Sequence, residues 1–159
     1  EVHLVVYPDV VEEIGLDRFM EFCLETRLYS VLGARNREAM RQMNGRGIVT
    51  SVFIDADLNE AAIENAKLSD RHIVMLRNRK EGVEAPPGVK TCKDRVEYVR
   101  ARGVRAPIFF VQGIENKAML EEVKASGCGG AYIGTTLMKL WDDEEALWAL
   151  LDSLQSCAD

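Results

Sequence analysis

Two glycine turns near the end of the chain carry the clearest chemical signal in the sequence. A β-rich stretch at residues 109–111 runs into a turn at Gly113, and a second at residues 131–133 runs into Gly134 and Thr135. Backbone N–H groups at such turns, and at a helix that begins near Thr135, are free to bind an anion. The last two strand-to-helix loops of many (β/α)8 barrels hold a phosphate in this way. We therefore predict phosphate binding at Gly113, Gly134 and Thr135; the alternative is that the glycines only form tight turns.

Other residues follow predicted strands and could bind or activate a substrate. Tyr7 closes the first such strand, Asp55 follows residues 48–54, and Arg77 follows residues 72–76. Barrel enzymes place their functional groups at the carboxyl ends of strands. Asp55 is the candidate general base for a cleavage or isomerisation, Tyr7 a candidate substrate contact, and Arg77 a candidate partner for a substrate anion. The alternatives are that the aspartate is a loop acid or helix N-cap and that the arginine is solvated.

Metal-binding and cofactor-binding patterns are missing from the sequence. The two histidines, His3 and His72, stand far apart in the sequence and form no metal-ligand motif. The four cysteines are widely spaced without a CxxC pair, which favours reduced thiols in a cytosolic protein. No dinucleotide-binding, Walker A or serine-nucleophile motif occurs. We therefore predict no metal, no cofactor and a cytoplasmic location.

Composition limits the classes of partner. The chain has 159 residues, 47% hydrophobic and 29% charged, which is typical of one globular domain. Its formal net charge of −6 gives no electrostatic footprint for nucleic acid. No apolar run reaches the roughly 18–20 residues that span a bilayer, and no signal peptide is visible. We expect neither nucleic acid nor a membrane as a partner.

The elements that position these residues alternate regularly between apolar β-rich stretches and stretches with helical spacing. Strands are predicted at residues 2–7, 28–33, 48–54, 72–76, 109–111 and 131–133, and helices at residues 17–26, 35–43, 59–68, 92–102, 116–125 and 143–154. Asn59 is the predicted cap of its helix. In the last helix, Leu147, Trp148, Leu150 and Leu151 are predicted to face inward.

Repeated strand–helix units without a hairpin signal predict a parallel α/β fold. A doubly wound sheet could consist of roughly six such units, whereas a closed (β/α)8 TIM barrel needs eight strands and about 200–250 residues. We predict a single barrel-type domain over residues 1–159. Its first two units are absent from this sequence or are supplied by a partner, or else the sheet is open.

Motifs along the chain resemble the later part of the tryptophan synthase alpha subunit, from about the third strand onward. Residues 5–19 resemble that family's third strand and helix, and residues 74–82 its sixth strand and mobile loop. Residues 111–114 resemble its Gly-Phe-Gly-Ile, and residues 134–139 its Gly-Ser-Ala-Ile-Val-Lys. The resemblance implies that Gly82 joins the phosphate site. It also places Gln112, which stands where the family has an aromatic residue, in the substrate pocket beside Arg77.

The resemblance implies a lyase of tryptophan biosynthesis. The family cleaves indole-3-glycerol phosphate to indole and glyceraldehyde 3-phosphate without a cofactor in this subunit, and passes indole to a beta subunit. A beta-like subunit or self-association is therefore the expected protein contact. The family's catalytic carboxylates would lie before Glu1, and its Asp-Val-Pro and Gly-Val-Thr-Gly motifs are replaced at residues 34–36 and 80–83. The alternative is a diverged, catalytically inactive barrel that binds a phosphate ligand or acts in regulation.

Overall fold

The strands of the protein form one parallel sheet in chain order. A computed structural model describes residues 4–5, 8–28, 30–32, 37–69, 73–77, 82 and 84–157. The strands are β1 (Leu4–Val5), β2 (Ser30–Leu32), β3 (Val49–Ile54), β4 (Ile73–Leu76), β5 (Ile108–Val111) and β6 (Gly130–Tyr132). Each strand pairs in parallel with the next one along the chain. A doubly wound sheet reverses its strand order at a switch point, so this uninterrupted order is that of a barrel.

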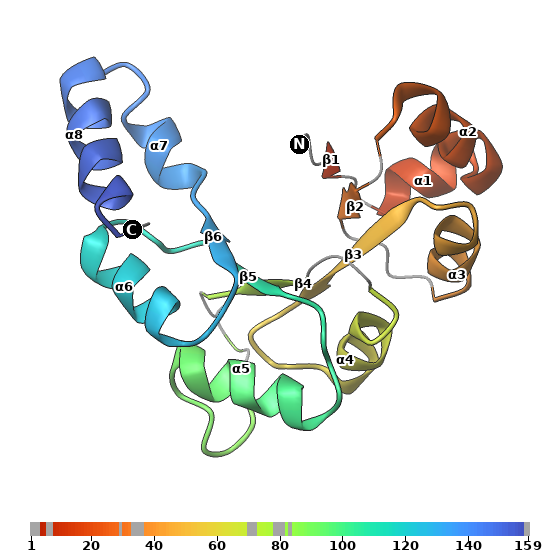
Figure 1. Cartoon of the computed structure of the whole chain (residues 1–159), viewed down its shortest axis with the longest axis horizontal. Helices are drawn as coiled ribbons and strands as arrows, with labels where there is room; N and C mark the ends of the chain where they lie inside the picture. Colours follow the sequence, from red (N-terminus) through yellow and green to blue (C-terminus); the bar gives the residue numbers. More distant parts are fainter. Residues whose placement is uncertain are drawn as a thin grey trace.

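The helices cover the outer side of the curved sheet. They are α1 (Pro8–Ile14), α2 (Leu16–Thr26), α3 (Arg37–Gly45), α4 (Glu60–Ala66), α5 (Cys92–Ala101), α6 (Lys117–Ala125), α7 (Thr135–Lys139) and α8 (Glu144–Gln155). Figure 1 shows the sheet as an arc with β1 at one end and β6 at the other, and with the helices on its convex side. The fold is therefore α/β of the TIM-barrel type, with six barrel strands in the described part of the chain.

Side-chain caps start the helices at the carboxyl ends of the strands. The Asn59 side chain accepts the N–H groups of Ala61 and Ala62 at 2.9 and 3.4 Å, which confirms its predicted role as a cap. Thr91 and Asp94 form a reciprocal capping box at the start of α5. Asn116 and Asp143 cap α6 and α8 through the N–H groups of Met119 and Ala146. These caps fix where the strand-to-helix loops end.

Helix α1 was not predicted from the sequence. Pro8 opens it, and proline suits the first helical position because its missing N–H would have no partner there. Gly15, with φ of 83°, separates α1 from α2. A helix of 7 residues shows little apolar spacing, and no Ser, Thr, Asp or Asn stands directly before Pro8 to mark its start, as Asn59 marks the equally short α4.

The hydrophobic core lies between the sheet and its helices. Alternate residues of the central strands face the helices and are at most 3% exposed: Val52, Ile54, Ile73, Met75, Ile108 and Phe110. They pack with residues of α4, α5 and α6. A second cluster joins α2 and α3 through Phe19, Met20, Cys23, Met43 and Ile48. One face of each central strand therefore packs against the helices in the core, and the other face points to the inside of the arc.

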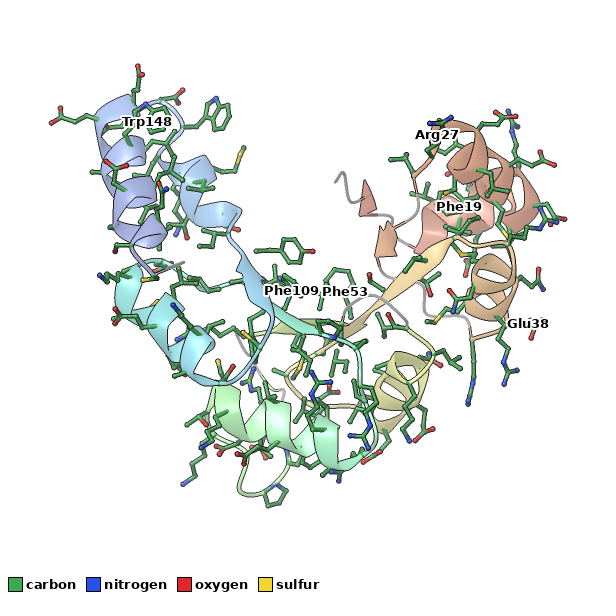
Figure 2. All side chains as sticks on the ribbon, viewed as in Figure 1. Phe19, Arg27, Glu38, Phe53, Phe109 and Trp148 are labelled. Atoms are coloured by element: carbon green, nitrogen blue, oxygen red, sulfur yellow. The ribbon has the colours of Figure 1, made fainter. Side chains whose placement is uncertain are left out.

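The concave face of the sheet is aromatic. Strand register sets Phe53, Val74, Phe109 and Gly130 in one row across four strands. Figure 2 shows Phe53 and Phe109 on the inner side of the arc. The Phe109 ring leans over Gly130, where an added Cβ would lie 2.7 Å from a ring carbon, and its centroid lies 5.5 Å from that of Tyr132. Bulky side chains on this face are what a (β/α)8 barrel uses to fill its interior.

Trp148 of the last helix does not pack as predicted. Trp148 is 58% exposed, so its predicted inward orientation is wrong, and Trp141 is 68% exposed. Spacing explains the error, because Leu147, Leu150, Leu151 and Leu154 already form one continuous stripe of α8 and Trp148 lies beside it. The Trp148 indole donates to Glu144 at 3.3 Å. Within the described part of the chain, no helix has the length and apolarity needed to cross a membrane.

We predict that this 159-residue chain self-associates in solution. β1 and β6 each have one neighbour in the described sheet, and unpaired strand edges are templates for association. Exposed apolar side chains stand near both ends of the arc: Val10, Ile14 and Phe22 on α1 and α2, and Met138 and Trp141 beyond β6. Size-exclusion chromatography with light scattering should give a mass above that of one chain, rising with concentration. A monodisperse monomer would contradict the prediction.

Candidate functional site

Strand register brings the predicted site residues to one edge of the sheet. Met75 of β4 lies beside Ile54 of β3 and Phe110 of β5, and Ala131 of β6 continues the row. Asp55, Arg77, Gln112 and Gly134 follow these strands within a few residues. All therefore lie at the carboxyl edge, which is where barrels of this type carry their sites.

The turn after β5 has an unusual backbone. Gln112 and Gly113 both adopt left-handed conformations, with φ of 69° and 67°. Gly113 adopts this conformation without strain, whereas Gln112 does so at a steric cost. Costs of this kind gather at functional sites. The Gln112 side chain is exposed at the edge.

Gly134 has a different reason to be glycine. It precedes α7 with φ of −116° and ψ of −69°, a region open to other residues. An added Cβ would meet no atom within 4 Å. Neither the backbone conformation nor the packing of the described protein therefore requires a glycine here. Two physical reasons for a glycine remain: its preference for the N-cap position of a helix, which Gly134 occupies in α7, and close approach of a ligand to the backbone.

The two glycine turns are joined to each other. The Thr136 hydroxyl, in the first turn of α7, donates to the Ile114 carbonyl at 2.8 Å. Lys139 of the same helix lies 3.5 Å from the Glu115 carboxylate. These contacts hold the start of α7, where Thr135 lies, beside the turn at Gly113. The predicted phosphate residues Gly113, Gly134 and Thr135 are thus brought together on neighbouring loops.

Arg77 lies behind the edge of the sheet and not on its concave face. It shares the side of β4 that carries Ile73 and Met75, which face the helices. Its guanidinium donates to the Gly113 carbonyl and to the Glu122 carboxylate of α6, both at 2.8 Å. Its side chain is 19% exposed. Arg77 therefore reaches the predicted site through the Gly113 carbonyl, with its charge already paired.

Cys92 lies against this ion pair at the start of α5. Burial, with the nearby Glu122 charge, raises the pKa of its thiol to about 11. The hydrogen bond from Arg77 lowers the pKa of Glu122, and the same bond raises the pKa of Arg77. At neutral pH the pair is therefore ionised and the thiol is protonated. All four cysteines are free of disulfides.

Asp55 is half-buried at the carboxyl end of β3. The alternation along the strand puts it on the same face as Phe53, so it belongs to the concave side. Asp57, two residues on, accepts the backbone N–H of Asn59 at 3.2 Å and so acts as a loop acid. Asp55 is therefore the carboxylate of this loop that lies on the concave side.

Of the other residues predicted for the site, the structure describes Gly82 but not Tyr7. Gly82 is exposed in the loop between β4 and α5, with φ of 76°. Tyr7, both histidines and residues 34–36 and 80–81 lie outside the described residues. Among the residues that are described, no three His, Cys, Asp or Glu side chains gather as metal ligands would.

Sequence reasoning missed two residues of the site. Glu122 gave no signal, because an acidic residue on an amphipathic helix is ordinarily solvated. Thr136 is part of a Gly-Thr-Thr sequence whose helix start was predicted, but nothing in the sequence showed that its hydroxyl would reach Ile114. Both roles depend on contacts between loops that lie far apart along the chain.

Comparison with solved structures identifies the fold. A tryptophan synthase alpha subunit from Pyrococcus furiosus superposes with a TM-score of 0.72 at 13% identity, covering 96% of this chain and 65% of its own. The fold is that of the tryptophan synthase alpha subunit. The alpha subunit from Legionella pneumophila gives a TM-score of 0.72 at 16% identity, covering 98% of this chain and 62% of its own.

Another similar structure, from Aquifex aeolicus, gives a TM-score of 0.74 at 18% identity and covers 97% of this chain. This chain spans 60 to 65% of the length of these structures. No family model and no curated protein matches the sequence. The tryptophan synthase alpha likeness therefore rests on the path of the backbone.

We predict that Cys92 is unreactive in the folded protein. A pKa of about 11 in place of 9.0 lowers its thiolate fraction near pH 8 about a hundredfold. Iodoacetamide labelling at pH 8, followed by peptide mass spectrometry, should show Cys92 modified far more slowly in the native than in the urea-unfolded protein. The half-buried Cys128 is the internal comparison. Equal labelling rates for Cys92 in both states would contradict the expected burial.

Proposed function

We propose that this protein binds a phosphorylated small molecule at the turns of Gly113 and Gly134, as a lyase of the tryptophan synthase alpha type. The observation that carries the proposal is Gly134, whose conformation and surroundings would admit a side chain. A ligand that approaches the backbone closely would account for a glycine at this N-cap position. The α-subunit fold supports the same assignment.

The anion would be held by backbone amides and not by a free cation. Arg77 is paired with Glu122, and Lys139 lies beside Glu115. The first N–H groups of α7 have no partner within the helix, and they lie beside the turn at Gly113. Preorganised amides of this kind bind phosphate without the side-chain ordering that a lysine would require.

The rest of the substrate would lie along the concave face. Phe109 and Tyr132, whose ring centroids lie 5.5 Å apart, would offer an indole ring aromatic contacts there. β4 separates β3 from β5, so Asp55 stands about 10 Å from the turn at Gly113. A substrate with its phosphate at the turn and its reacting carbon near Asp55 fits this arrangement.

Asp55 would act as a general base in the cleavage. In indole-3-glycerol phosphate the bond between indole C3 and the adjoining glycerol carbon breaks. The hydroxyl on that carbon loses its proton to the base and becomes the aldehyde of glyceraldehyde 3-phosphate, while indole C3 takes up a proton. The half-buried position of this carboxylate on the concave side supports the role.

A second candidate function is phosphate-ligand binding without catalysis. Gln112 favours it, because a polar, exposed side chain stands where the family has an aromatic residue beside its substrate. One solved structure of this fold is a tryptophan synthase a2b2 complex from Pyrococcus furiosus. By analogy we propose a beta-like subunit as a partner, with self-association as the alternative.

The phosphate site predicts that the protein binds both glycerol 3-phosphate and indole-3-glycerol phosphate. Calorimetric titration should show binding of each ester and loss of both in Gly134→Asp, because the new carboxylate would occupy and repel the anion site. Gly134→Asn adds nearly the same bulk without the charge, so any weakening of binding that it causes measures the steric part of the loss. Structure permits both changes, with no atom near the added Cβ.

The titration distinguishes the lyase from the non-catalytic phosphate-binding protein. Tighter binding of the indole ester would favour the lyase, and binding of glycerol 3-phosphate alone would favour the second candidate. No binding of either ester would mean that the glycines only form turns. Thermal unfolding of both variants would show whether a loss of binding comes from a loss of folding.

Asp55 as general base predicts that Asp55→Asn lowers kcat for indole release by about a hundredfold or more. Binding of indole-3-glycerol phosphate should be little changed, because the phosphate turns are intact. Asp57→Asn is the matched control: it alters an acid in the same loop that accepts the Asn59 N–H. An Asp55→Asn variant with the wild-type rate of indole release would exclude the role.

A further inference from the structure

We propose that Arg77 and Glu122 form a positioning clamp that aims the Ile114 N–H at the bound phosphate. The proposal rests on the phosphate site proposed above and assigns to it two residues that do not touch the ligand. Its starting observation is the 2.8 Å hydrogen bond from the Arg77 guanidinium to the Gly113 carbonyl.

Because the peptide unit is planar, this hydrogen bond to the Gly113 carbonyl also sets the direction of the Ile114 N–H. The Gly113 carbonyl and the Ile114 N–H belong to one planar trans peptide unit, so they point in opposite directions. Arg77 holds the carbonyl from the helix-facing side, between β4 and α6. The Ile114 N–H is therefore directed away from the helices, toward the open side of the turn.

The next peptide unit is held in a similar manner. The Thr136 hydroxyl donates to the Ile114 carbonyl at 2.8 Å. Two successive carbonyls of the turn are thus fixed by side chains from two other elements. The turn begins with left-handed Gln112 and Gly113, a conformation that needs such support.

Glu122 fixes the arginine itself. Its carboxylate accepts from Arg77 at 2.8 Å, and it also interacts with the thiol and backbone N–H of Cys92 at the start of α5. Arg95 donates to the Arg77 carbonyl at 2.9 Å and holds the end of β4. The clamp therefore joins β4, α5 and α6 behind the turn.

Arginine is required at this position because its planar fork spans two acceptors at once. A lysine ammonium on a flexible stem cannot hold both the Gly113 carbonyl and the Glu122 carboxylate in fixed directions. Arg77 Nε is buried without a hydrogen-bond partner among the described residues. The contacts to the turn and to Glu122 are therefore the ones that fix the side chain.

The test is a calorimetric titration of glycerol 3-phosphate into the wild-type protein and into Arg77→Lys and Glu122→Gln. Each change should raise Kd by about tenfold or more, the effect of losing one charge-assisted hydrogen bond in the supporting network. The second variant is the milder one, because it keeps the size of the side chain, and it serves if Arg77→Lys fails to fold.

The matched controls are Arg102→Lys and Glu60→Gln. This pair joins α4 and α5 on the surface through a 2.9 Å contact, with side chains 34% and 65% exposed. It repeats the chemistry of the clamp without touching the turn. Both controls should bind glycerol 3-phosphate as tightly as the wild type.

An amide-resolved readout separates positioning from general stability. In ¹H–¹⁵N spectra, glycerol 3-phosphate should shift the Ile114 amide of the wild type, and this shift should shrink in Arg77→Lys while that of Thr135 persists. Wild-type binding with no change of Kd or of the Ile114 shift in either clamp variant would overturn the clamp alone. No binding by the wild type would overturn the phosphate site and the clamp with it.

Discussion

The parallel pairing of each strand with its successor is the constraint on which the rest of this structure depends. Because every strand runs the same way, every carboxyl end reaches the same edge of the sheet, and every loop there leads outward to a helix. Asp55, Arg77 and the two glycine turns lie far apart along the chain and are neighbours only for this reason. The topology of the sheet, and not the chemistry of the side chains, brings the residues of the candidate site together.

The alternation of side chains along each strand then decides which face of the sheet a residue at that edge belongs to. Side chains in step with Met75 face the helices, and those in step with Phe53 face the inside of the arc. Arg77 falls in the first set and supports the turn at Gly113, whereas Asp55 falls in the second and lies on the concave side. Two charged residues that look equivalent in the sequence therefore have different positions relative to a ligand.

Much of the fold could be predicted from the sequence. Alternating β-rich and amphipathic stretches gave the parallel α/β class, and Asn59 was identified as a cap because capping is a local interaction. Strand order excluded the doubly wound alternative, and the backbone comparison established the barrel type. α1 was missed because it is short and, unlike the equally short α4, has no capping residue type directly before it. The burial of Trp148 was predicted wrongly because hydrophobicity alone does not say which face of a helix finds a neighbour.

The candidate site was predictable only in part. The glycines are visible in the sequence, but the reason for each depends on φ and on surrounding atoms, which differ between Gly113 and Gly134. The ion pair of Arg77 with Glu122 spans 45 positions and could not be seen in advance.

The hydroxyl of Thr136 has a consequence for the rate at which a ligand would bind the proposed phosphate site. By fastening the start of α7 to the Ile114 carbonyl, it makes the two turns one unit before any ligand arrives. Because the two turns are already held together, they lose little conformational entropy when a ligand binds. Association would then be a single encounter limited by diffusion and orientation, without a slower step in which the loops come together.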